Sequence, residues 1–566
     1  MPGLFLATLF FTACEQSTAP AEYADLCFAE VTSISAVQGE GWRSPLEGSY
    51  QQVAGAVTYV DPGSGYFIEQ AGDGQAGKAS RGMFVEAHRE ARDIEIGQHV
   101  VVGGRVDELG ERRDTLTSLA DVDRFALCES SLLPPLTQVQ LPLSNPEREA
   151  LEGMRIVFPQ ELYVSDVYSH YRGKLMLSAD SPLRVPTEDF PPGKEADRQA
   201  RDNRDRAIDV HDASFESSLA AAGSRFELLT GVMGHDGRDQ LFLILSRQGK
   251  PANTPDPITP TPQGGLRIVN ANLLNYFNGD GRGGGFPNER GAETLRELDR
   301  QEQRIRAAMA KIRPDLLAVQ ELENDGFGAN SAAQSLVAML NDGGSGDYAV
   351  VRAPANRLGA DVITVGLFYR KQAVEPIGPS HTLDTEPFRG LSRQPLAQVF
   401  RDITSGELFL VATNHLKSKG SCPETGPNKN QNDGQGCWNP ARVEAVEALL
   451  PWLEQVASAA GTRQILVLGD MNAHRMEDPI RAFRNGGYTE LVENISGLPQ
   501  YSFRFFGEAG TLDFAFASPQ LAGIARQARI WHINSDWPQN MDLPEPWLRM
   551  SDHDPVIVDL DFSKKL

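Results

Sequence analysis

The sequence lacks long apolar runs and an excess of positive charge. No stretch of 18 apolar residues lies inside the chain, so a membrane-spanning helix is not expected. Lys and Arg number 53 against 76 Asp and Glu, and the formal net charge is −23. This balance excludes a protein that holds nucleic acid by bulk positive charge. It does not exclude an enzyme that acts on a polyanion, because metal ions and a local basic cleft can replace bulk charge.

Cysteine is also scarce, with five in 566 residues. No two cysteines have the C-x-x-C spacing, so a zinc site is not expected. The four after Cys14 allow three pairings. The simplest joins Cys27 to Cys128 and Cys422 to Cys437, because each pair then brackets one segment. The alternative is four free thiols. Disulfides would indicate a compartment outside the cytoplasm.

The N-terminal residues differ from the rest of the chain. Residues 4–13 read LFLATLFFTA, a run too short to span a bilayer but typical of a signal-peptide core. Cys14 follows directly, and a polar tether follows Cys14, which resembles a bacterial lipoprotein signal. We therefore expect residues 1–14 to be a signal peptide that ends at a lipidated Cys14. The protein would then be exported, and either extracellular or anchored to a membrane. An ordinary cleaved signal is the alternative.

Turn-rich segments divide the region that follows. Short β-like runs separated by Gly and Pro predict a small closed sheet at 27–130, for which an OB-like barrel is one candidate. Residues 135–250 repeat this pattern more loosely and predict a second β-rich domain. Its polar stretch at 194–206 is interpreted as a loop or an exposed helix. The Pro-rich residues 251–265 predict an extended linker.

After the linker, residues 266–563 are typical of one large α/β unit. Apolar runs of about four to eight residues alternate with helical patterns, as expected for strands buried on both faces. Polar residues stand at the ends of these runs, where a rigid strand holds side chains within narrow tolerances. Any one of them alone is more often a solvated or structural group, but the ordered set indicates a site. The residues of this set are Asn272, Glu321, Asn414, His415, Asp470, Asn472, Asp513, Asp552 and His553.

The order of these motifs carries a family resemblance. The motifs are QE at 320–321, NHLKSKGS at 414–421, GDMNA at 469–473, TLD at 511–513 and SDHDP at 551–555. Together they resemble the endonuclease/exonuclease/phosphatase superfamily, the fold of pancreatic deoxyribonuclease. NLLNYF at 272–277 and the insert between Cys422 and Cys437 resemble a narrower branch, the secreted bacterial nucleases, which carry an OB-like domain ahead of the catalytic one. The resemblance implies a four-layer α-β-β-α sandwich.

The resemblance also implies roles for individual residues. Those expected to hold or support a divalent metal are Asn272, Glu321 and Asp552. Those expected to be catalytic are His415, Asp470, Asn472, Asp513 and His553. Asp513 would orient His553, and either Asp470 or His553 would take the proton from the attacking water. The expected metal is Mg²⁺, with Mn²⁺ or Ca²⁺ as alternatives, because a hard cation stabilises charge on phosphate oxygens.

Four further residues are candidates for substrate contact. Asn414 and Lys417 belong to the NHLKSKGS motif. Arg282 lies in a Gly-rich segment, which could instead be a surface loop without a role in binding. Tyr501 precedes Asp513 in a segment that could instead be a core strand.

The sequence therefore predicts an exported, metal-dependent phosphodiesterase that hydrolyses extracellular nucleic acid, with DNA favoured over RNA. The same fold acting on a phospholipid or nucleotide is an alternative, and a surface binding protein with a vestigial catalytic domain is another. A lipid anchor would make the membrane a second partner, and no protein partner is expected.

Membrane association is expected to depend on Cys14, because acylation would supply the anchor. Cys14→Ser should release or mislocalise the protein without changing its activity. Immunoblots of membrane and soluble fractions, with activity measured in each, test this expectation. A Cys14→Ser protein that stays with the membrane would contradict it.

Overall fold

The computed structural model describes residues 25–91, 93–110, 115–128, 132–212, 219–235, 241–247, 252, 257–262, 264–342, 347–539 and 541–563. The expected signal segment with Cys14 lies outside these residues, and the expected linker is described only in part. The chain divides into two compact units: residues up to 159 together with 228–248 form the first, and 160–227 together with 249 onward form the second. None of the described helices has the length and apolar character needed to cross a membrane.

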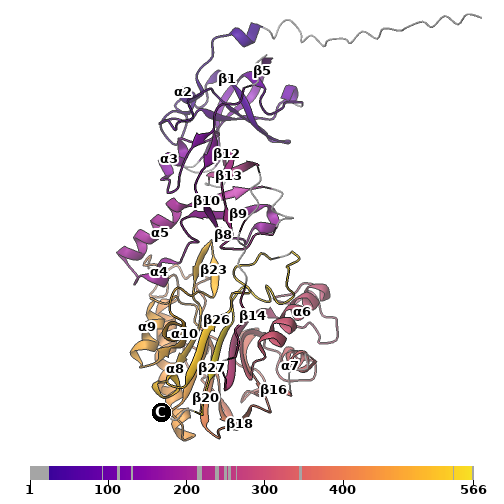
Figure 1. The fold of residues 1–566 in the computed structure, drawn as a ribbon, viewed down its shortest axis with the longest axis vertical. Coiled ribbons are helices and arrows are strands. Elements are labelled where there is room, and N and C mark those ends of the chain that lie inside the picture. The colour runs from indigo at the N-terminus through magenta and orange to yellow at the C-terminus, as the bar shows by residue number, and fades with distance from the viewer. Residues whose placement is uncertain are drawn as a thin grey trace, which may run out of the picture. The chain divides into compact units, whose positions relative to one another are not determined.

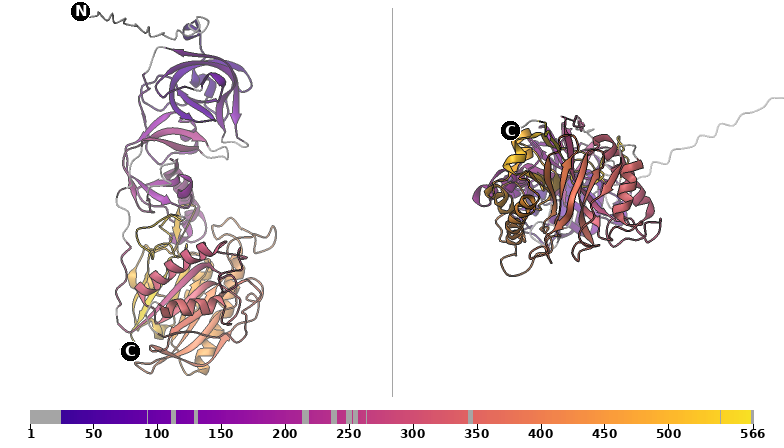
Figure 2. Two further views of the ribbon diagram at one scale, coloured as in Figure 1. Left: turned by 90° about the vertical axis from the view of Figure 1, so that its right-hand side faces the viewer. Right: turned by 90° about the horizontal axis from the view of Figure 1, so that it is seen from below.

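The first unit contains a closed five-stranded barrel (Figure 2). Its strands are β1 (Tyr50–Asp61), β2 (Gly65–Glu69), β3 (Gly82–Glu86), β4 (His99–Leu109) and β5 (Leu116–Cys128). Their order is β1-β2-β3-β5-β4, β1 pairs with β4, and β3 runs parallel to β5. The β-rich N-terminal region expected from the sequence is thus present. Cys27 and Cys128 form a disulfide with their Cα atoms 5.8 Å apart.

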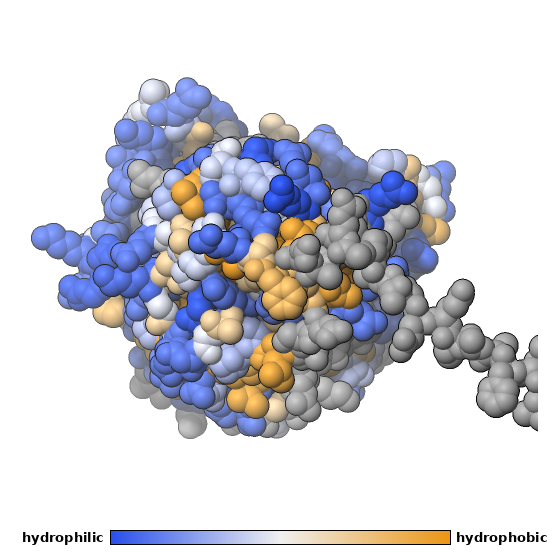
Figure 3. All heavy atoms as spheres, turned by 90° about the horizontal axis from the view of Figure 1, so that it is seen from above, coloured by the Kyte–Doolittle hydropathy of each residue, from blue (hydrophilic) through white to orange (hydrophobic). Residues whose placement is uncertain are grey.

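Apolar side chains inside the barrel form one cluster with α2 (Ile34–Gln38), which contributes Ile34 and Val37. On the face seen in Figure 3, hydrophilic residues predominate and apolar ones gather in small groups. Large apolar side chains exposed in this unit include Phe28, Ile96 and Leu127.

The described parts of residues 135–250 are also rich in strands, some of which belong to the first unit and some to the second. In the first unit, β6 (Thr137–Gln138), β7 (Arg155–Phe158), β12 (Leu229–His235) and β13 (Leu241–Arg247) lie in the order β13-β12-β7-β6. In the second, β8 (Leu162–Asp166), β9 (Lys174–Ala179), β10 (Ala207–His211) and β11 (Arg225–Phe226) lie in the order β11-β8-β9-β10. The polar stretch at 194–206 is a helix, α5 (Lys194–Arg206), which buries Ala196 and Asn203.

Residues from 266 onward form two six-stranded sheets. Sheet one has the order β16-β17-β15-β14-β27-β26, and sheet two has the order β18-β19-β20-β21-β25-β22. The strands of sheet one are β14 (Leu266–Tyr276), β15 (Leu316–Glu323), β16 (Tyr348–Val350), β17 (Ile363–Arg370), β26 (Ala525–Ile530) and β27 (Val556–Leu560). Those of sheet two are β18 (Val374–Thr382), β19 (Leu396–Asp402), β20 (Leu408–His415), β21 (Ile465–Asp470), β22 (Thr489–Glu490) and β25 (Asp513–Ala517).

Three apolar clusters hold these sheets in place. One cluster takes side chains from both sheets, among them Ile268 of β14 and Leu466 of β21. The second joins Val269, the neighbour of Ile268, to α6 (Leu295–Ile312) and α7 (Ala332–Asp342). The third joins sheet two to α8 (Asn439–Ala459) and α9 (Asp478–Asn485). In Figure 1, α6 and α7 lie on one side of the strands, and α8 and α9 lie on the other. The inner strands of each sheet, such as β20 and β21, are buried on both faces, which explains why they are continuous apolar runs.

Short elements complete the described chain. They are η1 (Asp25–Phe28), α3 (Asn145–Glu149), η2 (Arg89–Ala91), η3 (His170–Arg172), α4 (Pro186–Asp189), α10 (Leu491–Ser496), β23 (Phe503–Phe505), β24 (Glu508–Gly510) and α11 (Pro519–Ala522).

A buried ionic network joins α4 to the second sheet. Glu188 of α4 is 1% exposed. It accepts hydrogen bonds from Arg475 Nε at 3.0 Å, from the Thr511 backbone N at 2.9 Å and from Thr511 Oγ1 at 2.8 Å. The other side of the Arg475 guanidinium pairs with Glu490, so this buried cation lies between two carboxylates. Buried charges are costly unless paired, so α4 and the second sheet stabilise each other here.

We expect Glu188→Ala to lower the free energy of unfolding by about 3–5 kcal/mol, because it leaves buried donors without their acceptor. Glu375→Ala is the matched control, since Glu375 pairs with Arg401 at the surface, where an ion pair contributes about 0–1 kcal/mol. Urea unfolding followed by tryptophan fluorescence measures both. Equal losses in the two variants would contradict this account.

Candidate functional site

Most functional side chains expected from the sequence lie at or beside strand ends, whereas Asn272 and Glu321 lie inside β14 and β15, where the pairing register is irregular. In sheet one, β14 and β15 are parallel, and Asn272 stands opposite Gln320. In sheet two, β20 and β21 are parallel, and His415 stands opposite Asp470. The antiparallel strand β25 begins at Asp513, which also stands opposite Asp470. Strand register alone therefore brings an imidazole and two carboxylates together.

Asp470 is the centre of this group and is 2% exposed. Its Oδ2 atom lies 3.4 Å from Asn272 Nδ2, 3.5 Å from His415 Nε2 and 4.0 Å from His553 Nδ1. Its Oδ1 atom accepts the backbone N–H of Asn472 at 2.9 Å. Burial raises the pKa of the Asp470 carboxyl above its usual range, and the neighbouring His553 opposes that shift. A carboxylate in this setting is a stronger proton acceptor than one in water.

His553 and Asp513 form a buried hydrogen-bonded pair. His553 Nδ1 lies 2.7 Å from Asp513 Oδ2, and Ser502 Oγ donates to the same oxygen at 2.7 Å. Ser502 Oγ in turn accepts the backbone N–H groups of Leu512 and Asp513, each at 3.0 Å. Burial lowers the pKa of His553, but the Asp513 and Asp470 carboxylates outweigh burial and raise it well above its usual value. The pair thus holds an imidazolium in a fixed orientation.

His415 has the opposite character. It is buried, and its pKa is lowered well below the usual value by burial and by the positive charge of Arg393. Its Nδ1 atom has no hydrogen-bond partner among the described residues. Beside it, Asn414 donates to the backbone oxygen of Leu468 at 3.2 Å, so this amide braces β20 against β21. His415 is therefore a neutral imidazole next to Asp470.

Glu321, Asn272 and Asp552 supply oxygen atoms at the end of sheet one. Glu321 has a positive φ of 60°, an uncommon conformation for a residue other than glycine, and its Oε2 accepts the backbone N–H of Asn275 at 2.9 Å. Burial raises the pKa of Glu321, the nearby Asp552 carboxylate raises it further, and His553 and Asn272 oppose the shift. Two repelling carboxylates beside an amide are a donor set that suits a hard divalent cation.

No group of three or more His, Cys, Asp or Glu side chains in the described ranges has the arrangement of a metal site. The donor set above has only two carboxylates. That number fits Mg²⁺, which keeps several of its waters and binds proteins through one or two carboxylates.

Three expected substrate contacts are already engaged by the protein. Lys417 Nζ lies 3.2 Å from both Ser418 O and Ser418 Oγ, and 5.1 Å from the centre of the Trp438 ring. The Arg282 guanidinium donates to the side-chain oxygen of Asn330 at 3.0 Å. Tyr501 donates to Asp536 at 2.8 Å, and its ring stacks on His532 with centroids 4.2 Å apart.

Arg393 is a neighbour of His415 that belongs to none of the sequence motifs named above. Its backbone N–H donates to His415 O at 3.1 Å, and its guanidinium pairs with Asp361 at 3.1 Å. Arg290 pairs with the other Asp361 oxygen at 3.7 Å, and both arginines lie near enough to lower the pKa of His415. Arg393 stands outside the recognised motifs, so no pattern in the sequence points to it. These arginines make the surroundings of His415 locally basic in an acidic protein.

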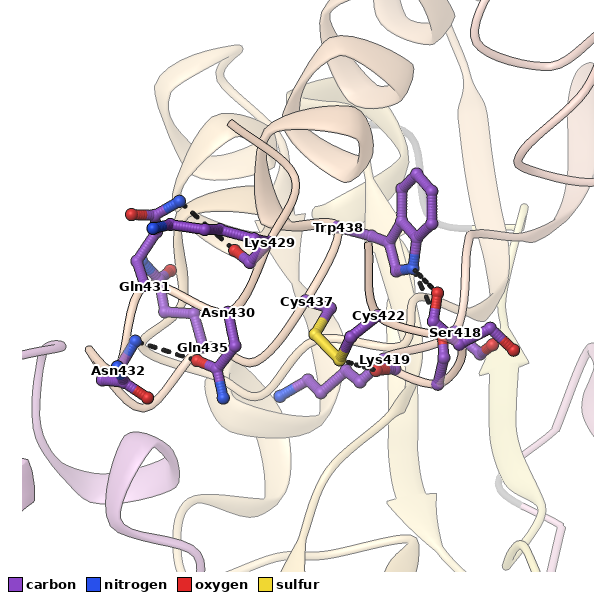
Figure 4. Close-up of a disulfide and its surroundings, with 12 residues drawn as sticks. Ser418, Lys419, Cys422, Lys429, Asn430, Gln431, Asn432, Gln435, Cys437 and Trp438 are labelled. Atoms are coloured by element: carbon purple, nitrogen blue, oxygen red, sulfur yellow. Dashed lines mark hydrogen bonds between the residues drawn. A yellow bond between two sulfur atoms is a disulfide. The ribbon is translucent and has the colours of Figure 1, made fainter. Parts of the chain in front are cut away.

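A disulfide between Cys422 and Cys437 closes the loop after β20 (Figure 4). The Trp438 indole N–H donates to Gly420 O at 3.0 Å, beside this bridge. Lys419 Nζ donates to the buried carboxylate of Glu477 at 2.6 Å and so ties the loop to the start of α9. The loop that carries Lys417 is therefore fixed by its own contacts as well as by the bridge.

The sequence profile described as "Endonuclease/Exonuclease/phosphatase family" matches residues 270–553. The chain belongs to this family. Its members are hydrolases that act on phosphoesters, and they commonly depend on a divalent metal. The matched range runs from β14 to His553 and contains every residue of the group around Asp470. No curated protein sequence matches the chain.

Several solved structures are similar to the family domain. The human Nocturnin catalytic domain with bound sulfate is 18% identical, covers 52% of this chain and 93% of its own, and has a TM-score of 0.35. The mannosyl-6-phosphatase of Bacteroides thetaiotaomicron is 15% identical over 52% of this chain and all of its own, with a TM-score of 0.37. An AP endonuclease from Archaeoglobus fulgidus is 15% identical over 52% and 99%, with a TM-score of 0.33.

Asp513 and His553 are expected to act as a unit, because a 2.7 Å hydrogen bond joins them and the Asp513 carboxylate fixes the orientation of the His553 imidazole. Asp513→Ala and His553→Ala should each lower the rate of phosphodiester hydrolysis by at least about a hundredfold, the usual scale for general acid–base catalysis. The double variant should be scarcely slower than either single variant. Steady-state rates on bis(p-nitrophenyl) phosphate measure this, and fully additive losses would show that the two residues act separately.

Proposed function

We propose that the protein is an exported, metal-dependent phosphodiesterase that hydrolyses nucleic acid, with DNA as the favoured substrate. The observation that carries this proposal is the position of Asp470, within 4.0 Å of His415 and His553 and 3.4 Å from Asn272. A proton acceptor, a neutral imidazole and a charged imidazole thus face one point, which is what hydrolysis of a phosphodiester needs.

Glu321, Asn272 and Asp552 would hold the divalent cation, proposed to be Mg²⁺. When bound, it would stabilise negative charge on the nonbridging phosphate oxygens. The chain's own groups complete the proposed reaction. Asp470 accepts a proton from the attacking water, and Asn472, whose Nδ2 donates to Leu416 O at 3.1 Å, borders the place of attack. Asp513 fixes His553, which gives a proton or a hydrogen bond to an oxygen of the phosphate.

A bond forms between the water oxygen and phosphorus, and the bond from phosphorus to the leaving oxygen breaks. Asp470 holds the proton taken from water, and the His553 imidazolium gives its proton to the leaving oxygen and becomes neutral. The products are a phosphomonoester and an alcohol. The basic surroundings of His415, with Arg393 and Arg290, favour a substrate with several negative charges.

The N-terminal barrel supports a nucleic-acid substrate. We infer that it is an OB-type barrel, because its strand order β1-β2-β3-β5-β4 with parallel β3 and β5 is a Greek-key path closed on itself. OB folds often bind single strands. We likewise infer a four-layer α-β-β-α sandwich for residues 266–563, from the two sheets and the helices packed on their outer faces. Export is supported by the two disulfides, which persist in oxidising compartments.

Glu321→Gln is expected to abolish most hydrolysis while leaving the fold intact, because it removes a ligand charge and keeps the side-chain shape. Glu323→Gln is the matched control: Glu323 lies on the same strand and accepts a backbone N–H, that of Asn278, at 3.2 Å. Each protein is assayed on plasmid DNA, RNA and phospholipid vesicles, with Mg²⁺ or with EDTA.

A Glu321→Gln protein with wild-type rates in Mg²⁺ would make the metal assignment wrong. If the wild type hydrolysed phospholipid but neither DNA nor RNA, the proposal of a nucleic-acid substrate would be wrong. The alternative, a phosphodiesterase that acts on phospholipid, would then be favoured.

A further inference from the structure

The hairpin of β23 and β24 carries two exposed aromatic side chains. β23 pairs with β24 so that Phe503 stands opposite Gly510 and Phe505 opposite Glu508. Phe506 and Gly507 make the turn, with φ of 47° and 79°, which is the pair of positive values that a tight two-residue hairpin needs. Phe505 is 61% exposed and Phe506 is 74% exposed. A hairpin that presents two phenyl rings to water is a costly arrangement without a partner.

These rings continue a row that begins at His553. The His553 and Phe503 ring centroids are 4.5 Å apart, at an interplanar angle of 33°. Phe503 and Phe505 lie on the same face of β23, because side chains alternate along a strand, and their nearly parallel rings are 6.3 Å apart. Phe505 and Phe506 meet edge to face at 4.4 Å. One aromatic surface therefore leads from the imidazole beside Asp470 to the solvent.

The hairpin is held rigidly although its tip is exposed. Asn203 of α5 donates to Glu508 at 2.6 Å, and the backbone N–H of Val185 donates to Ala509 O at 2.9 Å. A Cβ atom on Gly507 would lie only 2.5 Å from Met176 Sδ, so the turn packs directly on β9. A tip anchored in this way offers a preformed surface, and a partner that lands on it loses little entropy by ordering it.

The surroundings of Phe503, Phe505 and Phe506 favour a flat, uncharged ligand group. Arg504, on the opposite face of β23, is directed at Asp536 with an Nε–Oδ1 distance of 2.7 Å and is buried in that ion pair. It is therefore not free to grip a phosphate at the tip. What the tip presents is the faces and edges of phenyl rings, and these bind the π-face of a nucleobase irrespective of its sequence.

We propose that Phe505 and Phe506 form a stacking platform for the bases of a single-stranded nucleic acid whose phosphate lies at Asp470 and His553. This inference rests on the proposed nuclease function and adds to it the strand form of the substrate. In a duplex the base faces are covered by neighbouring bases, so a platform of this kind selects unpaired or unstacked bases.

The test compares base-containing and abasic strands. Wild type, Phe505→Ala, Phe506→Ala and the double variant are assayed with Mg²⁺ on a single-stranded oligodeoxynucleotide and on an abasic oligomer of equal length. The alanine variants should raise KM for the base-containing strand roughly 5- to 100-fold, the range that loss of one stacked base gives. Their KM for the abasic oligomer should change far less, so the preference for bases should shrink.

Two controls keep a folding defect separate from a binding defect. Phe505→Trp retains an aromatic face and should preserve the preference for bases. Ile403→Ala removes a half-exposed apolar side chain after β19, near the start of β20 and hence at the opposite end of that strand from His415. It should leave the preference at its wild-type value.

The outcomes separate this inference from the function on which it rests. Wild type that cleaves bis(p-nitrophenyl) phosphate but neither oligomer would overturn the nuclease proposal and the platform with it. Wild type that cleaves the oligonucleotide, with variants that keep the preference for bases, would overturn the platform alone. Equal losses on both oligomers would also overturn it, because they would show a general defect and not lost stacking.

Discussion

The contact between Asp513 and His553 is the constraint on which the candidate site depends. Asp513 begins β25 in sheet two, and His553 lies just before β27 in sheet one, so a 2.7 Å hydrogen bond joins the two sheets at their rim. The apolar cluster between the sheets fixes their separation, and that separation allows this bond to form. Asn272 reaches from sheet one to Asp470 in sheet two in the same way. Small shifts of one sheet against the other would break both contacts.

The site also concentrates buried negative charge. Several carboxylates lie close together where water is largely excluded, and their protonation depends on one another. His553 neutralises part of this charge. A cation at Glu321 and Asp552 would neutralise more of it, so the metal proposed for the reaction would also relieve repulsion in the folded protein. The net charge of the chain is −23, yet the arginines near His415 make one small region of the site basic.

The central residues could be singled out because each borders an apolar run: His415 and Asp470 are the last residues of β20 and β21, and Asp513 is the first of β25. Strand ends are visible in a sequence, and the parallel pairing of β20 with β21 places His415 opposite Asp470. The partners of long side chains could not be predicted in this way. Tyr501 reaches Asp536 and Lys417 folds back on its own loop, and these choices depend on where remote segments pass in space.

Glu188 shows the same limit more strongly. The sequence around α4 is polar and does not indicate that the Glu188 carboxylate is buried. The apolar strands against which it is buried begin only at Leu266. Its partners Arg475 and Thr511 lie 287 and 323 residues away along the chain. Such a contact has no local pattern of spacing, since only the assembled sheets create the buried pair of donors that the carboxylate satisfies.

This network determines where the polypeptide can be divided. The Pro-rich stretch before Leu266 looks like a natural place to cut, yet a fragment that begins there loses Glu188. The backbone N–H of Thr511, two residues before Asp513, then lacks its acceptor, and Arg475 loses one of the two buried carboxylates that flank it. A piece that retains the network must include Glu188, and the compact unit that contains Glu188 begins at residue 160.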